Sequence, residues 1–246
     1  MSDAQLQGKV AVVSGASQGI GRAITTSLTS EGVDVLMCGR SADALLKAVE
    51  QVVTGHRPGC RQGRVEVYAA DVRDPSQMDS LMARAVNTFG RLDILINNAG
   101  VGLFQPLAEL SIEDWRTVLE TNLSGVFFAC HAAIPLLRRG GGGWIINVSS
   151  LAGSHPFMGG AAYCASKAGL NALSEVLVQE LRDDDIRVSC VAPGSVDTRF
   201  GGANDGSSAT WKLDPIDVAQ VVLDLLSHPP RSLPSRVEIR PSHTRK

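Results

Sequence analysis

Short apolar runs alternate along the chain with longer segments in which apolar residues recur every three or four positions. The runs span five or six residues, are rich in Val and Ile, and are almost continuously apolar. That pattern is expected of strands buried on both faces of a parallel sheet. We expect one strand within each of the segments KVAVVSG, VDVLMCGR, RVEVYAAD, LDILINNAG, GWIINVSS and IRVSCVAPG.

The segments between these runs have the spacing of amphipathic helices, in which one apolar stripe faces the core. Three such stripes lie in the first half of the chain, before residue 90. Longer helices are expected over about 111–138 and 162–182, and another over about 215–227. The apolar–charged segment from Val237 to Ile239 predicts a further strand at the edge of the sheet.

The regular alternation of strand and helix predicts an α/β fold, a single-domain Rossmann fold. We expect a doubly wound parallel sheet of about seven strands, flanked by helices. No repeat, linker or second cycle of alternation divides the chain, so residues 1–246 are expected to form one domain. Residues 199–211 form a loop longer than a connection needs, and such loops often contact substrates.

Composition and charge exclude several classes of protein. The net charge of −2 leaves no electrostatic footprint for nucleic acid or an anionic membrane. No apolar run is long enough to span a membrane, and the polar N-terminus does not resemble a signal peptide. We therefore expect a cytoplasmic protein. The sequence contains no CxxC pair, so we expect the cysteines to be reduced thiols and not metal ligands or disulfides. They are Cys38, Cys60, Cys130, Cys164 and Cys190.

The first candidate for chemistry follows the first expected strand. That strand runs into SGASQGIG, which places Gly15, Gly19 and Gly21 just before a helix. Glycine lets the backbone approach a phosphate closely, and a helix N-terminus offers unpaired N–H groups. The motif therefore predicts dinucleotide binding, although a glycine-rich turn without a ligand has the same composition. Its spacing is G-x-x-x-G-x-G, which differs from the usual G-x-G-x-x-G.

The end of the second expected strand bears on which dinucleotide binds. An NAD-binding chain usually has an acid there, which hydrogen-bonds the ribose. Here the strand ends in Gly39, and Arg40 follows. An arginine pairs with a 2′-phosphate, which an acid would repel. We therefore favour NADP(H) over NAD(H), while a solvated arginine at a helix start is the alternative.

A second site is indicated by Tyr163 and Lys167, which lie one turn apart on an expected helix. A lysine ammonium nearby favours the phenolate and would lower the tyrosine pKa, so that the phenol could exchange a proton with a carbonyl oxygen or an alcohol. An accidental pair on a helix surface is the alternative. The ends of other strands supply small polar residues, Ser149 and Ser150 among them, at the same edge of the sheet.

These motifs, in this order, resemble those of the short-chain dehydrogenase/reductase family. SGASQGIG is similar to the family's TGxxxGIG, with Ser14 in place of Thr, and NNAG, the N of ETNLSG, SS, YCASK and PG recur at family spacing from about residue 7 to residue 227. Within the family the chain resembles the 3-oxoacyl-carrier-protein reductases. The resemblance implies an NADP-dependent oxidoreductase that acts on CH–OH or C=O groups.

The resemblance also implies roles for individual residues. Tyr163 would be the general acid/base, Lys167 would lower its pKa and bind the nicotinamide ribose, and Ser150 would orient the substrate carbonyl. Asn122 would hold a water in a proton relay. The implied cofactor-binding residues are Gly15, Ser17, Gln18, Gly19, Ile20, Gly21, Arg40, Asp71, Val72, Asn98, Ala99, Gly100, Tyr163, Lys167, Pro193, Gly194, Val196 and Thr198.

The sequence leaves the substrate and the assembly open. The expected pocket walls are mostly apolar: Leu151, His155, Phe157, Met158 and the 199–211 loop with Phe200 and Trp211. A carrier-linked 3-oxoacyl compound and a free ketone, aldehyde or quinone all fit this description. Many NADP-dependent relatives have a basic residue where this chain has Gln18, and the C-terminal segment departs from the family pattern. We interpret Arg240 to Lys246 as a frayed surface tail.

The resemblance bears on assembly, and one alternative to an enzyme remains. The family usually forms homo-oligomers, so a dimer or a homotetramer is expected. A non-catalytic NADP(H)-binding sensor or scaffold on the same fold is the alternative to an enzyme, since a fold does not by itself specify a function.

Overall fold

The computed structural model describes residues 6–54, 62–198, 200–202 and 211–243. Within these residues, seven parallel strands form one sheet in the order β3-β2-β1-β4-β5-β6-β7. The strands are β1 (Val10–Ser14), β2 (Asp34–Gly39), β3 (Val65–Ala69), β4 (Ile94–Asn97), β5 (Gly143–Val148), β6 (Ile186–Pro193) and β7 (Arg236–Ile239). The α/β class, the parallel sheet and the edge position of the last strand are confirmed.

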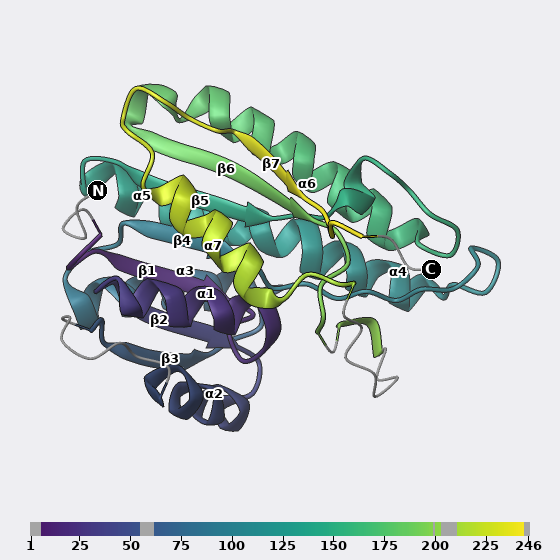
Figure 1. Cartoon of the computed structure of the whole chain (residues 1–246), viewed down its shortest axis with the longest axis horizontal. Coiled ribbons are helices and arrows are strands. Elements are labelled where there is room, and N and C mark those ends of the chain that lie inside the picture. The colour runs from purple at the N-terminus through teal and green to yellow at the C-terminus, as the bar shows by residue number, and fades with distance from the viewer. Residues whose placement is uncertain (1–5, 55–61, 199, 203–210, 244–246) are drawn as a thin grey trace.

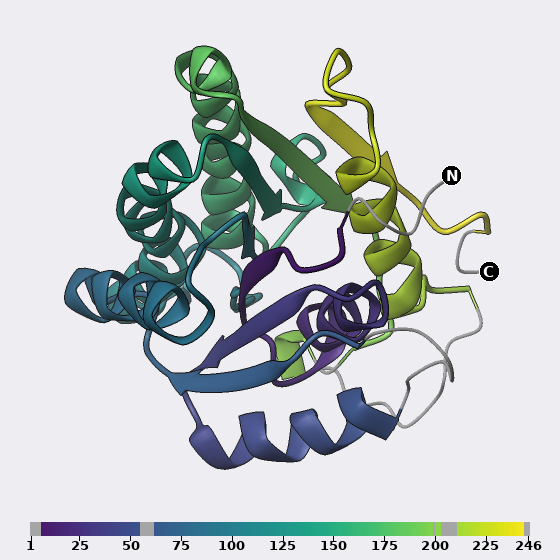
Figure 2. The ribbon, with the colours of Figure 1, turned by 90° about the vertical axis from the view of Figure 1, so that its left-hand side faces the viewer.

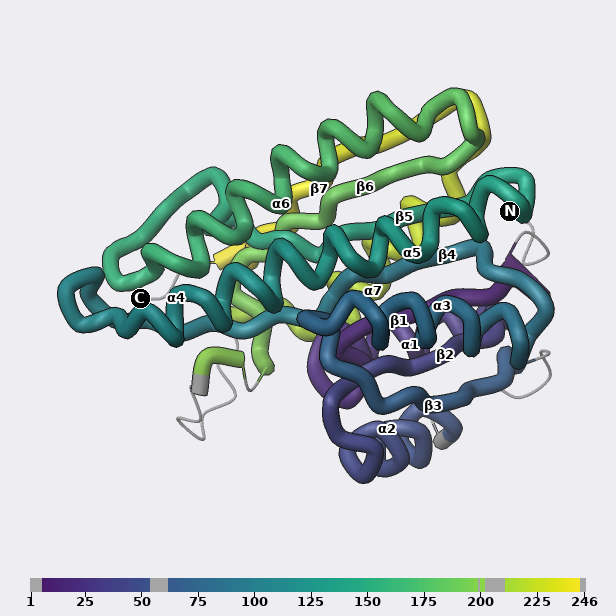
Figure 3. The backbone as a smooth tube through the Cα atoms, turned by 180° about the vertical axis from the view of Figure 1, so that it is seen from behind, coloured from purple at the N-terminus to yellow at the C-terminus, as the bar shows by residue number. Residues whose placement is uncertain are grey.

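Helices cover both faces of the sheet, as expected of a doubly wound fold (Figure 1, Figure 2). The α-helices are α1 (Gly19–Ser30), α2 (Ala42–Thr54), α3 (Pro75–Phe89), α4 (Ile112–Leu119), α5 (Gly125–Arg139), α6 (Ala161–Glu180) and α7 (Pro215–Leu226). One core packs α1, α2 and α7 on one face of the sheet. The other core packs α3, α5 and α6 on the opposite face, which is the face seen in Figure 3.

The burial of each strand follows its place in the sheet. Every residue of the central strand β1 is buried, whereas the edge strand β7 alternates between exposed and half-buried positions. The alternation explains why charged residues such as Arg236 and Glu238 are tolerated in β7, since their side chains lie in solvent. Within the described residues, no helix has both the length and the hydropathy needed to cross a membrane.

The helix expected over 111–138 is present but is not uniform. Between α4 and α5 the backbone forms a π-helical turn, Glu120–Ser124, while the direction of the chain is kept. Single π-turns of this kind interrupt α-helices frequently at functional sites. The helix expected over 162–182 ends at Glu180 and is followed by a short 3-10 turn, Arg182–Asp184.

Part of the expected substrate loop lies outside the described residues, namely 199 and 203–210. Its described part contains a 3-10 turn, Phe200–Gly202, and continues from Trp211. Residues 55–61, before β3, also lie outside the described residues, and they include Cys60.

The order of the strands decides where a ligand can bind. The chain passes from β1 outward through β2 and β3, and then returns to the other side of β1 to form β4. Ligands of open α/β sheets bind beyond the carboxyl ends of the strands at such a reversal.

Candidate active site

A pocket of about 790 Å³ opens at the carboxyl edge of the sheet, where the chain leaves β1, β2, β4, β5 and β6. The structure thus brings together segments that are far apart in the sequence. All but two of the residues expected to bind or react line this pocket; the exceptions are Gly21 and Asn122. The lining members of that set are Gly15, Ser17, Gln18, Gly19, Ile20, Arg40, Asp71, Val72, Asn98, Ala99, Gly100, Ser150, Tyr163, Lys167, Pro193, Gly194, Val196 and Thr198.

The glycine-rich turn after β1 has the shape of a phosphate-binding loop. Gly15 and Gly19 adopt φ angles of 64° and 53°, which favour glycine over residues with a side chain. A Cβ on Gly21 would lie 2.3 Å from the carbonyl oxygen of Gly15, so the close packing of the turn requires its absence. Gly21 therefore supports the turn from behind, which explains why it does not line the pocket.

The N-terminus of α1 is open towards the pocket. Its N-cap, Gln18, is extended and makes no side-chain cap, and the first turn of the helix contains no acid. Unpaired N–H groups and the positive end of the helix dipole suit an anionic group such as a diphosphate. The residues present at this end of the pocket therefore fit a dinucleotide.

Ser14, which stands where the family has Thr, ties the glycine turn to the end of β4. Its Oγ accepts hydrogen bonds from the backbone N–H groups of Asn98 and Ala99, both at 3.1 Å. The Asn98 side chain in turn donates to the carbonyl oxygens of Ser14 and Gly15, at 3.0 and 3.1 Å. The Ser14 hydroxyl thus accepts both backbone N–H groups at the end of β4, as a threonine hydroxyl could. Asn98 both lines the pocket and holds the glycine turn in place.

The far end of the pocket is basic at the carboxyl end of β2. Arg40 is exposed and lines the pocket directly after Gly39. The acid in the same strand, Asp34, lies at the opposite end and is held by Arg64, with 2.8 Å between Oδ2 and Nη2. It therefore cannot meet a ribose in the pocket.

One cation at this end was not anticipated from the sequence. Arg73 lines the pocket and forms an ion pair of 2.6 Å with Asp71. Hydrogen bonds from Arg73 lower the pKa of Asp71, and the charge of Arg40 acts in the same direction. The position of Arg73, two residues after the expected cofactor-binding residue Asp71, was the available signal.

The tyrosine–lysine pair is enclosed at the middle of the pocket. Lys167 is only 4% exposed, and its Nζ donates to the carbonyl oxygen of Val148 over 2.9 Å. The same Nζ lies 5.8 Å from the centre of the Tyr163 ring. Burial lowers the pKa of Lys167 to about 8, because the charged form is removed from water.

The pKa of Tyr163 moves in the direction opposite to the one expected from the sequence. Burial raises the pKa of the phenol above its ordinary value, and a hydrogen bond with Ser150 only partly opposes that shift. Desolvation of the phenolate is thus the larger effect. At neutral pH Tyr163 keeps its proton and Lys167 keeps its charge.

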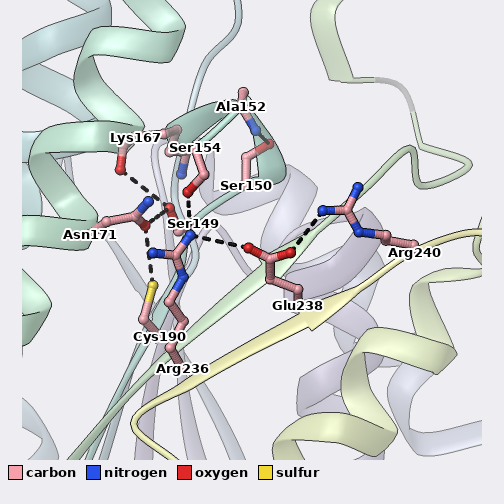
Figure 4. Close-up of polar contacts among 10 residues, drawn as sticks. All are labelled: Ser149, Ser150, Ala152, Ser154, Lys167, Asn171, Cys190, Arg236, Glu238 and Arg240. Carbon is pink, nitrogen blue, oxygen red and sulfur yellow. Dashed lines mark hydrogen bonds and ion pairs between the residues drawn. The ribbon is translucent and has the colours of Figure 1, made fainter. Parts of the chain in front are cut away.

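The two serines after β5 differ in their surroundings. Ser150 is half-buried and caps the short turn Leu151–Gly153, where its Oγ accepts a hydrogen bond of 3.1 Å from the N–H of Ala152. Ser149 is buried, and its Oγ donates to the side-chain oxygen of Asn171 over 2.6 Å. Ser150 is therefore the serine that adjoins Tyr163. Ser149 is instead engaged by Asn171 of α6, as Figure 4 shows.

Asn171 is a second residue that the sequence interpretation missed. It lies one helical turn beyond Lys167 on α6. Its side-chain oxygen also accepts a hydrogen bond from the Cys190 thiol, with 3.4 Å between Oδ1 and Sγ. Asn171 therefore joins α6 to the ends of β5 and β6. The spacing of four residues from Lys167 would have been a signal for it.

Asn122 lies in the π-helical turn and is completely buried. Its Nδ2 donates to the carbonyl oxygen of Val101 at 2.9 Å and to Ser166 Oγ at 3.1 Å, and its Oδ1 accepts from the N–H of Val101 at 2.8 Å. Ser166 Oγ donates to the backbone oxygen of Tyr163. Asn122 thus connects the loop after β4 to the start of α6, and does not itself line the pocket.

Aromatic rings lie beside Tyr163 in the pocket. Phe104 lies 5.5 Å, centre to centre, from both Tyr163 and Phe157, and Phe200 lies 5.6 Å from Tyr163. Of the expected walls, Met158 is wrong, because it is 97% exposed and does not line the pocket. The expected walls that do line it are Leu151, His155, Phe157, Phe200 and Trp211; Val101, Phe104, Lys212, Arg240, Pro241 and His243 were not anticipated.

Comparisons with known proteins agree with this geometry. A family model described as short chain dehydrogenase matches residues 9–206. The chain is 34% identical over 236 residues to an uncharacterized oxidoreductase of Staphylococcus aureus (strain N315), covering 96% of this chain and 98% of that protein. It is 33% identical over 237 residues to one of Staphylococcus saprophyticus, covering 96% and 99%.

Two solved structures are similar over nearly the whole chain. An alcohol dehydrogenase from the archaeon Thermococcus sibiricus, complexed with 5-hydroxy-NADP, is 30% identical with a TM-score of 0.87, covering 97% of this chain and 98% of that one. A metagenomic short-chain oxidoreductase in complex with NADP is 36% identical with a TM-score of 0.83, covering 98% and 100%.

The packing of the glycine turn generates a first prediction. Gly21→Ala places a Cβ against the Gly15 carbonyl, so the turn must shift. We expect a loss of about 1–3 kcal/mol in the free energy of unfolding and a loss of NADPH affinity of about tenfold or more. Urea unfolding and fluorescence titration measure the two effects. Gly140→Ala is the control, because its added Cβ meets no atom closer than 3.4 Å; unchanged NADPH affinity in Gly21→Ala would contradict the prediction.

The buried lysine generates a second prediction, on stability. At pH 7 Lys167 is charged in both the folded and the unfolded chain, so the full desolvation penalty is present. As the pH rises from about 8 towards 10.5, the folded protein loses this proton first and the penalty disappears. Lys167→Met should therefore be more stable than the parent at pH 7, and this advantage should shrink by about 2 kcal/mol at pH 10.

Urea unfolding of both proteins at the two pH values measures this difference. Lys47→Met, a change of an exposed lysine on α2, is the matched control and should show no such dependence on pH. An equal loss of stability at both pH values in Lys167→Met would mean that the ammonium contributes no desolvation penalty.

Proposed function

Because the chain belongs to the short-chain dehydrogenase/reductase family, we propose that it is an NADP(H)-dependent oxidoreductase that reduces a carbonyl compound to an alcohol. The observation that carries the proposal is the meeting of Tyr163, Lys167 and Ser150 in the same pocket as the glycine-rich turn. The family relatives are oxidoreductases, and two structural neighbours are complexes with NADP or 5-hydroxy-NADP.

In this proposal the substrate carbonyl lies beside Tyr163 and Ser150. The Ser150 hydroxyl orients the carbonyl oxygen, and the Tyr163 hydroxyl donates its proton to that oxygen as the alcohol forms. The raised pKa of Tyr163 suits this direction, since the phenol keeps its proton at neutral pH. The Lys167 ammonium then stabilises the phenolate that remains. Asn122 acts as a positioning residue, through Ser166 and the backbone of Tyr163.

The nicotinamide cofactor, when bound, would supply the hydride for this reduction. The residues that would hold its two ends differ in character. The glycine turn and the open N-terminus of α1 suit the diphosphate. Pro193, Gly194, Val196 and Thr198 line the same pocket at and after the end of β6. Lys167 would also hold the nicotinamide ribose.

The preference for NADP(H) rests on Arg40, with Arg73 as a second cation nearby. Both line the pocket where β2 and β3 end, and Asp71 is already paired with Arg73. A 2′-phosphate would therefore meet the guanidinium of Arg40, with no unpaired carboxylate in the described lining to repel it.

The substrate that these walls favour is a small carbonyl compound with an apolar portion. Phe104, Phe157 and Phe200 are 45%, 47% and 38% exposed, so they offer apolar surface beside Tyr163 that a substrate could bury. A free ketone, aldehyde or quinone and a carrier-linked 3-oxoacyl chain all meet this description.

We also propose a homo-oligomer, a dimer or a tetramer, in a cytoplasmic setting. Phe127 on α5 and Val176 on α6 are 50% and 47% exposed on the same layer of helices, and exposed apolar side chains are frequent at interfaces. A cytoplasmic setting is supported by thiols that are unpaired throughout the described residues, at Cys38, Cys130, Cys164 and Cys190.

The role of Tyr163 is tested by removing its hydroxyl. Tyr163→Phe should lower kcat for carbonyl reduction by about a hundredfold or more, because the proton donor is lost while the ring is kept. NADPH oxidation against a panel of ketones, aldehydes and quinones measures it. Tyr68→Phe, at the chain's other tyrosine, is the matched control. Tight NADPH binding without turnover in the parent protein would favour the non-catalytic sensor instead.

The role of Arg40 is tested by reversing its charge. Arg40→Asp should lower kcat/KM for NADPH by about tenfold or more, since a charge-assisted pair with the 2′-phosphate is lost, while kcat/KM for NADH is kept or raised. The same substitution at Arg84, which is exposed on α3, is the control. An unchanged ratio of NADPH to NADH activity would refute the 2′-phosphate contact.

A further inference from the structure

The described part of the C-terminal segment, residues 240–243, contributes to the pocket, contrary to its interpretation from the sequence as a frayed surface tail. Arg240, Pro241 and His243 all line the pocket, after β7 has ended at Ile239. Nothing in the proposed reduction so far uses these residues. Two of the three carry basic groups, so their place in the pocket bears on which substrate it accepts.

Pairing of β7 with β6 holds this segment in place. The strands are parallel with Pro193 opposite Ile239, and the N–H of Gly194 donates to the carbonyl oxygen of Ile239 over 2.8 Å. Pro241 packs so closely on Gly194 that an added Cβ there would lie 3.0 Å from its Cδ and 3.2 Å from Leu151 Cδ1. Arg240 therefore lies between two residues, Ile239 and Pro241, that contact the pocket wall at Gly194. Leu151, on the same wall, directly follows Ser150.

The charges around Arg240 do not balance. Glu238 lies between two guanidiniums, with Arg236 at 3.2 Å and Arg240 at 2.8 Å (Figure 4). Both arginines keep the pKa of Glu238 below its ordinary value, so this carboxylate stays charged. One carboxylate shared by two guanidiniums leaves an excess positive charge, and Glu238 itself does not line the pocket.

Arg236 has a further partner, whereas Arg240 retains donors. Arg236 also donates to Ser154 Oγ, which fixes its guanidinium away from the pocket. The Arg240 side chain is 51% exposed. Among the described residues it forms an ion pair with Glu238, in which only its Nη2 donates a hydrogen bond. Its remaining N–H groups are available to an anion, which a guanidinium can bind through two parallel hydrogen bonds.

No carboxylate at this end of the described pocket competes for Arg240. The acid that lines the pocket is Asp71, which is paired with Arg73 at the end of β3. Lys212 lines the pocket too, but lies 3.7 Å from Asp197 and adds little excess charge. His155 and His243 line the same pocket and can donate hydrogen bonds.

We propose that Arg240, with His243 and His155 beside it, forms an anion subsite, and that the substrate is an oxo compound bearing a carboxylate or a phosphate. This rests on the proposed function. The carbonyl lies at Tyr163, the apolar portion lies against Phe104 and Phe157, and the anionic group reaches Arg240. Arg240 is thus a specificity-determining residue for the reduction.

The test compares matched substrates in the parent protein and in Arg240→Gln. Aryl and alkyl oxo acids are assayed with NADPH beside their methyl esters, and oxo phosphate monoesters beside the corresponding alcohols. We expect the parent to favour the anion of at least one pair by about tenfold in kcat/KM, mainly through KM. Arg240→Gln should remove this preference, and Arg240→Lys should keep part of it.

The control substitution is Arg84→Gln, which should leave the preference unchanged because Arg84 is exposed on α3. The two kinds of pair distinguish a carboxylate from a phosphate. Equal kcat/KM for every anion and its neutral partner in the parent would overturn the subsite. A fall in Arg240→Gln that is equal for both members of a pair, with a raised KM for NADPH, would overturn it as well, because Arg240 would then serve the cofactor.

A second measurement separates the subsite from the proposed reaction. Thermal unfolding in the presence of NADP⁺ is followed with each oxo acid and oxo phosphate and with its neutral partner. Binding to the folded protein raises Tm, so the anion should raise Tm in the parent and not in Arg240→Gln. If the parent reduces no compound, the proposed function fails, and the rise in Tm caused by the anion still tests the subsite. An equal rise in Tm in the parent and in Arg240→Gln, or no rise in either, would overturn the subsite.

Discussion

The parallel pairing of β1 with β4 is the constraint on which the rest of the site depends. It brings the end of β1 against Asn98 and Ala99, which follow β4, so that Ser14 binds both backbone N–H groups. Gly15 and Gly21 have to lack side chains because the two segments and α1 converge there. The same reversal of strand order leaves a crevice beyond the carboxyl ends of the strands, and the segments that follow these strands line the pocket there.

Burial at the centre of this edge moves the two titratable groups in opposite directions. It raises the pKa of Tyr163 and lowers that of Lys167, since each neutral form is favoured away from water. A buried ammonium lowers the stability of the fold, and the structure accommodates it with a hydrogen bond to the Val148 carbonyl. Sites that combine such shifted groups in a pocket are where chemistry is expected, although a structural role can shift a pKa too.

Much of the fold could be predicted because its signals are local. Apolar runs such as Val10–Ser14 and the stripe of Met78, Leu81 and Met82 reflect burial within single elements. The π-helical turn at Glu120–Ser124 could not be predicted, since the shift in backbone hydrogen bonding leaves no trace in the apolar period. The chemical environment of Tyr163 was predicted with the wrong direction of pKa shift, because helical spacing shows that Lys167 is near and does not show how dry the site is.

The sequence by itself determined the order of the elements, the glycine turn at the start of α1, and the spacing of Tyr163 and Lys167 on one helical face. Each of these depends on residues close together in the chain. The tertiary structure alone decided that Asn171 engages Ser149, that Asn122 lies outside the pocket, and that Arg240 lines the pocket. These are contacts between segments far apart in the chain, and they depend on strand register and burial, which no local pattern specifies.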